Sequence, residues 1–135
     1  MCTGVRFADA AGNLYFGRNL DWCESYGEGV VITPRGASIP TQFLGSLSPE
    51  HACVGMGIVV GGVPCYFDCA NEAGLAIAGL NFPGYAQFAE DPEKGAVNVA
   101  AYEFPLWVAA SFSTVAEVRK ALKDVVIVAK APSEG

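Results

Sequence analysis

Residues 3–20, TGVRFADAAGNLYFGRNL, carry two short apolar runs on either side of a turn-rich segment. In the first run, residues 3–8, apolar side chains alternate with others, and the second, residues 14–20, is rich in aromatic and apolar side chains. Between them, residues 9–13 contain the Asp, Gly and Asn that favour a tight turn. The pattern predicts an antiparallel β-hairpin, in which facing residues can be paired.

The length of the turn predicts the register of this hairpin. A five-residue loop puts Gly4 opposite Arg18 and Cys2 opposite Leu20. Opposed residues project to the same face of a sheet, so Arg18 shares the face of Cys2. Asp21 then lies just past the end of the partner strand, beside residue 2. A slip of one residue would move Arg18 to the other face, so the prediction depends on the loop length.

Cys2 follows Met1 directly, and removal of Met1 would make it an N-terminal cysteine. One residue then carries both a thiol and a free α-amino group. An α-amine titrates near ~8, so it can act as a base close to neutral pH. Such a nucleophile needs no histidine. The alternative is that Cys2 is an ordinary second residue, and with Met1 attached its nitrogen is an amide and cannot be the base.

Arg18 lies inside an apolar strand, where a charge is costly unless it is paired or faces a pocket. One interpretation is a structural ion pair with Asp21. The other is catalytic: Arg18 lowers the pKa of the Cys2 thiol, and Asp21 holds the protonated α-amine. Asn81, at a strand end, is either a turn residue or a donor of N–H groups to an oxyanion. The residues alone leave these alternatives open.

The remaining chain predicts further strands and then helices, an α+β arrangement with a twisted antiparallel sheet. Gly61 and Gly62 separate two β-prone runs and indicate a second hairpin. The segment from 37 to 52 reads as a surface excursion. A helical period begins at about residue 98, with Pro105 tolerable only in a first turn or as a kink. A second helix is expected to begin with a capping box of Thr114 and Glu117 and to have Val115, Val118 and Leu122 on its core side. The expected strands are 30–33, 53–60, 63–69, 75–80 and 125–128, and the last of them has no expected partner.

Composition bounds the possible functions of the 135 residues. The formal net charge is −6 and the few Lys and Arg are scattered, which argues against nucleic-acid or anionic-membrane binding. We find no signal-peptide pattern and no uncharged apolar stretch of about 18 residues, and we therefore expect a cytoplasmic protein that does not span a membrane. Five cysteines without regular spacing indicate free thiols.

No cofactor or metal site is expected. The single histidine, His51, reads as a surface residue rather than as half of a Cys-His pair. Cys65 and Cys69 are four apart on a predicted strand, roughly 13 Å, which is too far for two zinc ligands. We therefore expect Cys53, Cys65 and Cys69 to be small buried hydrophobes.

Five stretches together resemble the choloylglycine hydrolase family of N-terminal-nucleophile hydrolases, which includes bile salt hydrolases and penicillin V acylases. They are Met1-Cys2-Thr3, YFGRNLDW at 15–22, YFDCANE at 66–72, GLAIAGLNFPGY at 74–85 and EFPLWV at 103–108. The resemblance covers essentially the whole chain, and it is strongest to the bile salt hydrolases of gut bacteria such as bifidobacteria.

The resemblance implies an αββα sandwich, with residues 1–135 as the N-terminal part of a single domain. It also implies that Cys2 attacks the amide bond between a bile acid and glycine or taurine, with Arg18 and Asp21 as active-site residues and Asn81 in the oxyanion hole. The implied substrate-binding residues come from aromatic-rich loops, as an apolar substrate requires: Leu20, Trp22, Tyr26, Phe67 and Phe82.

Family members are more than twice as long as this chain. The missing part is implied to carry further active-site residues, the remaining strands and much of the contact of a homo-oligomer, a tetramer at full length. Two alternatives to bile salt hydrolysis stay open. One is acyl cleavage of penicillin V or of acyl-homoserine lactones, and the other is an inactive fragment or non-catalytic binding module with open sheet edges.

Overall fold

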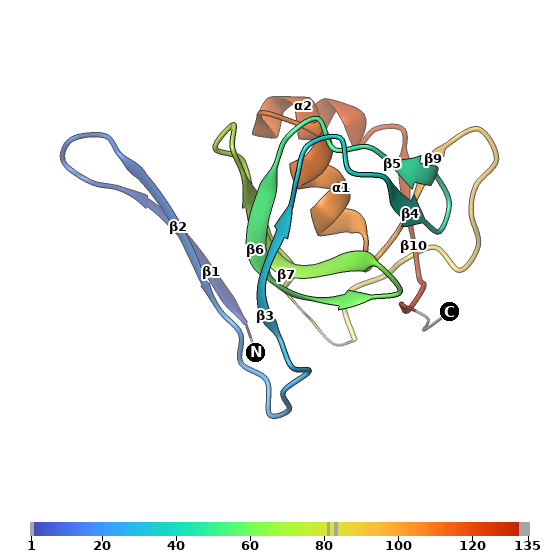
Figure 1. Cartoon of the computed structure of the whole chain (residues 1–135), viewed down its shortest axis with the longest axis horizontal. Helices are drawn as coiled ribbons and strands as arrows, with labels where there is room; N and C mark the ends of the chain where they lie inside the picture. Colours follow the sequence, from blue (N-terminus) through green and yellow to red (C-terminus); the bar gives the residue numbers. More distant parts are fainter. Residues whose placement is uncertain (1, 81, 83, 133–135) are drawn as a thin grey trace.

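The computed structural model describes residues 2–80, 82 and 84–132. A four-stranded antiparallel sheet forms its centre, with helix α1 packed against it, α2 above α1 at the top of the view, and a long hairpin projecting to one side (Figure 1). The mixture of antiparallel sheet and helices confirms the predicted α+β class. No helix among these described residues is long and apolar enough to cross a membrane.

The projecting hairpin consists of β1 (Thr3–Ala8) and β2 (Leu14–Asn19), with the predicted register. Its loop is closed by Asp9, whose carboxylate accepts hydrogen bonds from the backbone N–H groups of residues 11 and 13. Gly12 supplies the left-handed conformation at the turn, with φ of 86°. The local turn chemistry therefore fixes which residues face each other down to the base of the hairpin, where Gly4 is paired with Arg18.

The central sheet has the strand order β3-β6-β7-β8, and neighbouring strands are antiparallel. Gly61 and Gly62 form the tight β6–β7 turn with φ values of 57° and 81°, as the glycine pair predicts. Strand β7 is two residues longer than predicted, whereas β8 covers only the middle of the predicted strand 75–80. The bounds are β3 (Gly29–Thr33), β6 (Cys53–Val60), β7 (Val63–Asn71) and β8 (Ala76–Ala78).

A β-bulge interrupts the pairing of β6 with β7. Met56 is paired with Asp68 and the next residue, Gly57, with Tyr66, so Phe67 is the extra residue on β7. A side chain on Gly57 would place its Cβ 2.5 Å from the carbonyl oxygen of Cys65. Glycine therefore lets the bulged strand approach its neighbour closely, and the bulge turns the aromatic side chain of Phe67 out of the regular alternation.

The prediction of a surface excursion over residues 37–52 is wrong. The segment forms a small hairpin of β4 (Ile39–Thr41) and β5 (Gly45–Leu47). Ile39 is buried in the core that α1 and β7 share, and Leu47 packs against the same cluster. The apolar residues are too few for a periodic signal, but their packing into this cluster makes the segment part of the core.

The expectation of a helical period from residue 98 and of an unpartnered strand at 125–128 is also wrong. Residues 97–100 form β9 (Val97–Ala100), which pairs in parallel with β10 (Val125–Val128). A parallel pair needs a long connection, and here both helices provide it. The partner strand β9 lies directly before the helices. If the helical pattern is extended back to residue 98, it covers β9 and hides this strand.

Helix α1 (Phe104–Ser111) is apolar on nearly every side and is buried. Pro105 lies in its first turn, where its missing N–H costs no hydrogen bond, as predicted. Leu106 and Ala109 pack against Tyr66 and Cys69 of β7. This contact between α1 and the sheet forms the main core of the chain.

Helix α2 (Val115–Ala121) begins with the predicted capping box, in which the Thr114 hydroxyl and the Glu117 carboxylate each accept a backbone N–H. The predicted core side is only partly correct. Val118 packs against a second core cluster, but Val115 and Leu122 are exposed; that cluster consists of Leu75, Val99, Trp107 and Val108. In the described part of the chain α2 lies at the surface, and it contacts the core through one side of the helix only.

Candidate active site

The base of the hairpin brings Cys2 and Arg18 to one cavity of about 320 Å³. Gly4 is paired with Arg18, and Cys2 directly precedes β1, two residues before Gly4. Side chains two residues apart on a strand share a face, which explains why both residues line the cavity. The predicted shared face of Cys2 and Arg18 is therefore confirmed.

Arg18 is held by the central sheet rather than by its own hairpin. Its side chain is only 6% exposed, and its Nη2 donates a hydrogen bond to the carbonyl oxygen of Gly79. Its Nε lies 3.6 Å from a carboxylate oxygen of Asp68. Nε and Nη1 are buried and find no hydrogen-bond partner among the residues that the structure describes. The guanidinium thus brings a positive charge with spare donors to the cavity.

The structural alternative for Arg18, an ion pair with Asp21, is wrong. Its ion pair is with Asp68, fifty positions further along the chain. Asp21 instead accepts a hydrogen bond of 2.9 Å from the side-chain amide of Asn19. Because Arg18 and Asn19 are neighbours on one strand, their side chains point to opposite faces, and Asp21 belongs to the face away from Arg18.

Aromatic side chains form much of the cavity wall, and the lining is mainly apolar. Trp22 is stacked on Tyr26, and Tyr26 meets Phe67 at a ring-centroid distance of 6.0 Å. Four of the five predicted substrate-binding residues line the cavity: Leu20, Trp22, Tyr26 and Phe67. A cleft with these walls suits a rigid apolar molecule with one polar end.

Phe82, the fifth predicted residue, is not among the described residues that line this cavity. Its ring packs on that of Tyr85, with centroids 4.8 Å apart, and it is 54% exposed. A contact between close neighbours in sequence therefore holds Phe82 at the surface. Asn81, the predicted oxyanion donor, and Met1 lie outside the described residues.

Several lining residues were not predicted from the sequence. Tyr66 comes from β7, and Tyr102 and Pro105 come from the junction of β9 with α1. Asp68, which pairs with Arg18, belongs to the motif at 66–72 but had no predicted role. The available signal was a carboxylate in an otherwise apolar predicted strand, at Asp68. The sequence does not indicate its partner, because only the fold brings Asp68 beside Arg18.

Burial divides the five cysteines into two groups, and all five are free thiols. Burial raises the pKa of Cys53 and of Cys65 to about 11 and that of Cys69 to about 12, with smaller contributions from nearby negative groups. These three residues are buried hydrophobes, as predicted. Cys23 is exposed, and Cys2 is half-buried at the cavity.

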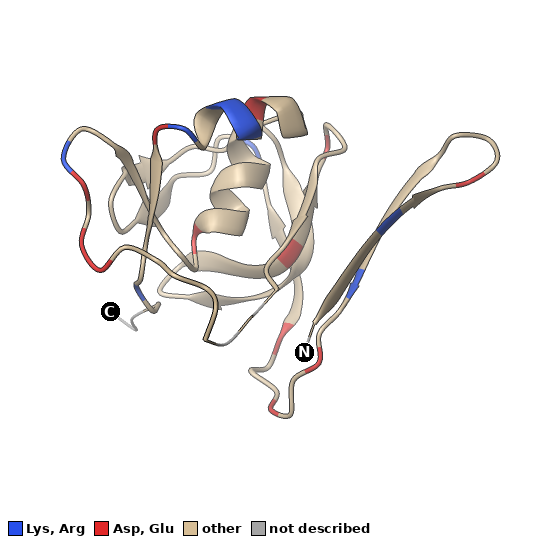
Figure 2. Cartoon of the chain, turned by 180° about the vertical axis from the view of Figure 1, so that it is seen from behind, with Lys and Arg blue, Asp and Glu red and all other residues tan. Residues whose placement is uncertain are grey.

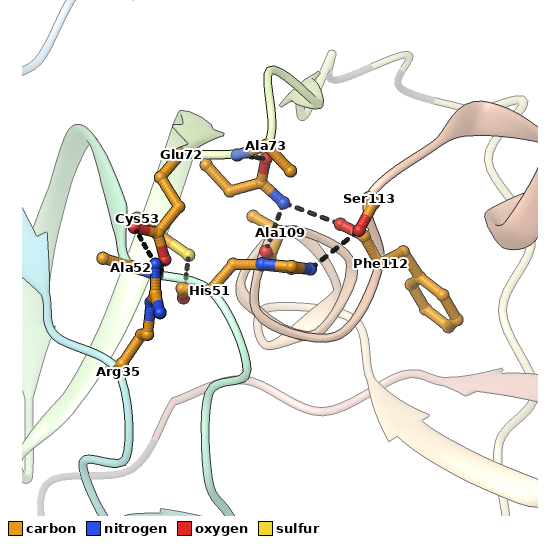
Figure 3. Close-up of polar contacts among 10 residues, drawn as sticks. Arg35, His51, Ala52, Cys53, Glu72, Ala73, Ala109, Phe112 and Ser113 are labelled. Atoms are coloured by element: carbon orange, nitrogen blue, oxygen red, sulfur yellow. Dashed lines mark hydrogen bonds and ion pairs between the residues drawn. The ribbon is translucent and has the colours of Figure 1, made fainter.

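His51 is half-buried rather than a plain surface residue, and its Nε2 lies 3.0 Å from the hydroxyl of Ser113 (Figure 3). Beside it, the side-chain amide of Asn71 donates to the carbonyl oxygens of Ala109 and Phe112 at the end of α1. The contacts in Figure 3 tie loops to the helix end, and His51, Phe112 and Ser113 line a different cavity from that of Cys2. No three His, Cys, Asp or Glu side chains in the described part of the chain are grouped to hold a metal ion.

Charges are spread over the chain, and Figure 2 shows acidic and basic segments interspersed on the hairpin, the sheet, the loops and α2. The cavity at the hairpin base contrasts with this scatter, because one buried arginine faces mainly apolar walls there. A guanidinium in such surroundings interacts strongly with any anionic group that enters.

Comparison with known proteins identifies relatives along nearly the whole chain. The model of the family "Linear amide C-N hydrolases, choloylglycine hydrolase family" matches residues 2–134. A bile salt hydrolase/transferase of Bifidobacterium longum subsp. longum is 57% identical over 131 residues, which make up 96% of this chain and 41% of that protein. A conjugated bile acid hydrolase of Lactobacillus gasseri is 56% identical over 131 residues, or 97% of this chain and 42% of that protein. The chain thus spans about two fifths of the length of these curated relatives.

Solved structures show the same fold. The crystal structure of the C2A mutant of conjugated bile acid hydrolase from Clostridium perfringens superposes with a TM-score of 0.93 at 37% identity, covering 100% of this chain and 41% of that one. A penicillin V acylase from Agrobacterium tumefaciens has a TM-score of 0.73 at 20% identity, with 95% of this chain and 40% of that chain covered. At that identity the second likeness concerns the fold alone.

Proposed function

Because this chain belongs to the choloylglycine hydrolase family of linear amide C–N hydrolases, we propose that the protein hydrolyses conjugated bile salts. The bond cleaved is the amide between the bile acid and glycine or taurine. The observation that carries the proposal is the cavity in which Cys2 and the buried Arg18 meet beneath aromatic walls. The names of relatives at 56–57% identity support the same substrate class.

The nucleophile in this proposal is Cys2 after removal of Met1. Its α-amine takes the proton of the thiol, and the sulfur attacks the carbonyl carbon of the amide. The carbon–nitrogen bond breaks, and the amine of glycine or taurine leaves with that proton. Water then attacks the thioester, the bile acid is released, and the thiol is restored. No histidine or metal takes part in these steps.

Arg18 and Asp21 act on the two ends of Cys2. Arg18 presents positive charge to the reacting groups, because its guanidinium is buried beside the cavity, next to Asp68, and neither Nε nor Nη1 has a hydrogen-bond partner among the described residues. Asp21 favours the protonated form of the α-amine. Asn81 donates an N–H to the oxyanion of the tetrahedral intermediate.

The aromatic residues at the cavity bind the steroid body. Leu20, Trp22, Tyr26 and Phe67 supply apolar contact area, and the bulge at Phe67 directs its ring to the cavity. Burial of apolar surface is the main source of affinity for such a substrate. Phe82 stays a proposed contact of the complete pocket.

Residues 1–135 form the N-terminal part of a single domain in this proposal, and the rest of the protein completes the αββα sandwich. The chain spans about two fifths of its relatives, and the exposed apolar side chains on the hairpin, among them Val5 and Phe7, support a covering by further strands. The complete protein is a homotetramer in the cytoplasm of a gut bacterium. The five free thiols fit a reducing compartment.

The test compares taurine release from taurocholate with phenoxyacetate release from penicillin V. The protein is expected to prefer taurocholate, to lose Met1 as seen by intact mass, and to lose all activity on Cys2→Ala. The matched control is Cys23→Ala, which removes an exposed thiol and keeps the rate. Preference for penicillin V would assign the alternative acylase activity. Retention of Met1, or equal rates for Cys2→Ala and the unchanged protein, would contradict the mechanism.

A further inference from the structure

The side-chain amide of Asn19 links two parts of the proposed machinery. Its Oδ1 accepts a hydrogen bond of 2.8 Å from the backbone N–H of Thr3. Its Nδ2 donates a hydrogen bond of 2.9 Å to a carboxylate oxygen of Asp21. Thr3 and Asn19 are directly opposed in the hairpin, so one side chain reaches across the strand pair and along its own strand.

The N–H of Thr3 belongs to the peptide bond that joins Cys2 to the rest of the protein. A peptide unit is planar, so a hydrogen bond to this N–H also orients the carbonyl group of Cys2 and the position of its Cα. The thiol of Cys2 lines the cavity with Arg18, whereas Thr3 and Asn19 belong to the other face. Asn19 therefore acts on the backbone of the nucleophile, away from the thiol.

We propose that Asn19 is a positioning residue that holds the backbone of Cys2 and the carboxylate of Asp21 in a fixed relation. The inference rests on the proposed function, in which Asp21 stabilises the protonated α-amine of Cys2. It adds a residue to that site, because both ends of the amine–carboxylate contact are set by a single side chain. Asn19 itself touches neither the substrate nor the thiol.

A carboxamide is the group that suits both neighbours at once. Thr3 N–H requires an acceptor and the ionised Asp21 requires a donor, and asparagine carries one of each on a short side chain. Aspartate in the same place keeps the acceptor but puts a second negative charge beside Asp21. Alanine removes both contacts.

Other charged groups at this end of the hairpin are Arg18 on the opposite face of β2 and Asp68 on β7, which are paired with each other, and Glu24 and Glu28 in the loop that follows β2. They are the same in every variant considered, so a shift between variants reports on Asn19 and Asp21. The hairpin also provides a matched control. At its far end Asn13 donates through its side-chain amide to Asp9 with a bond of 2.8 Å, which is the same chemistry without Cys2 nearby.

The experiment measures kcat/KM for taurocholate against pH in Asn19→Asp, Asn19→Ala and Asn13→Asp of the full-length protein. Asn19→Asp is expected to lower kcat/KM about 10- to 100-fold. It is also expected to move the acidic limb of the pH profile of kcat/KM to higher pH by about one unit, because added negative charge favours the protonated amine. Asn19→Ala moves the limb to lower pH, because Asp21 is no longer held. Asn13→Asp leaves both the rate and the limb unchanged.

A second readout needs no substrate. Alkylation of Cys2 by iodoacetamide, followed by mass spectrometry across pH, is expected to move to higher pH in Asn19→Asp and to stay in place in Asn13→Asp. If the acidic limb of the pH profile stays at the wild-type pH in both Asn19 variants, the inference is overturned, even if the rate falls. A protein that cleaves no taurocholate but shows the alkylation shift would overturn the proposed substrate and keep the role of Asn19.

Discussion

The β1–β2 hairpin and the body formed by the central sheet and α1 are held in opposite ways. In the body, Leu106 is fully buried and packs against Tyr66 and Cys69. On the hairpin, Val5 is 52% exposed and Phe7 is exposed as well, and the strands project from the rest of the chain (Figure 1). The contrast shows that packing stabilises the body, whereas Cys2 and Arg18 of the proposed machinery lie at the base of the hairpin, where Arg18 joins it to the body.

The largest difference between the two regions is expected for apolar truncations. Leu106→Ala leaves a cavity in the body and should lower the free energy of unfolding by about 2–5 kcal/mol. Val5→Ala on the hairpin should cost less than about 1 kcal/mol, because half of its surface is already in water. Urea denaturation measures both. Equal losses would show that the hairpin is as firmly packed in the protein as the body.

The cysteines provide the next contrast. The pKa values of Cys53 and Cys65 are raised to about 11 and that of Cys69 to about 12 by burial. At pH 8 their alkylation should be slower than that of an ordinary exposed thiol by about 100-fold or more, since the thiolate is the nucleophile. Timed alkylation with peptide mapping should find Cys2 and Cys23 labelled first. Early labelling of Cys69 would mean that the body opens easily.

The bulged ladder within the body predicts a smaller effect. Gly57→Ala forces a Cβ to within 2.5 Å of a backbone oxygen and should destabilise the protein by about 1–3 kcal/mol. Its cross-strand partner Gly29 is the matched control, because a Cβ there meets nothing within 4 Å. Denaturation curves of the two variants separate close packing from the general cost of replacing a strand glycine. Equal curves would contradict the close approach at the bulge.

The smallest effect is expected at an exposed ion pair. Hydrogen bonds from Arg35 and from the N–H of Ala52 lower the pKa of Glu72 from 4.5 to about 2. A lowered pKa in the folded state adds stability above pH 4.5 that is lost as pH falls to about 2. Glu72→Gln should therefore be less stable than the parent at pH 7 and equal to it near pH 2.

Urea midpoints at pH 7, 4 and 2.5 measure this dependence, with Glu90→Gln in an exposed loop as the control. A constant gap between Glu72→Gln and the parent at all three values would show that the carboxylate charge is not what stabilises the contact.

Local chemistry made the hairpin predictable, and long-range contacts made other parts unpredictable. Asp9 and Gly12 define a loop length, and the loop length defines the register that brings Arg18 to the face of Cys2. The partner of Arg18 is different, because Asp68 lies fifty positions away and only the packing of the hairpin on the sheet selects it over Asp21.

The same division explains the misses in the fold. Strand β9 is followed by helices, so its parallel partner β10 is remote in sequence and no local pattern predicts their pairing. The β4–β5 hairpin depends on the burial of Ile39 in the core that α1 and β7 share, which again comes from tertiary packing. Of the proposed substrate residues, Phe67 reaches the cavity wall through a bulge that strand periodicity does not show.

Because Phe67 is the extra residue of the bulge, the chain length at this point can change the cavity wall without changing the pairing of the sheet. Every other paired residue of β7 keeps its partner on β6 if this one residue is left out, since Tyr66 and Asp68 already face consecutive positions. A deletion of Phe67 is therefore neutral to the register, whereas a deletion elsewhere in β7 would turn half of the strand over. Position 67 is therefore a place in this sheet where the loss of one residue changes the cavity wall and keeps the strand register.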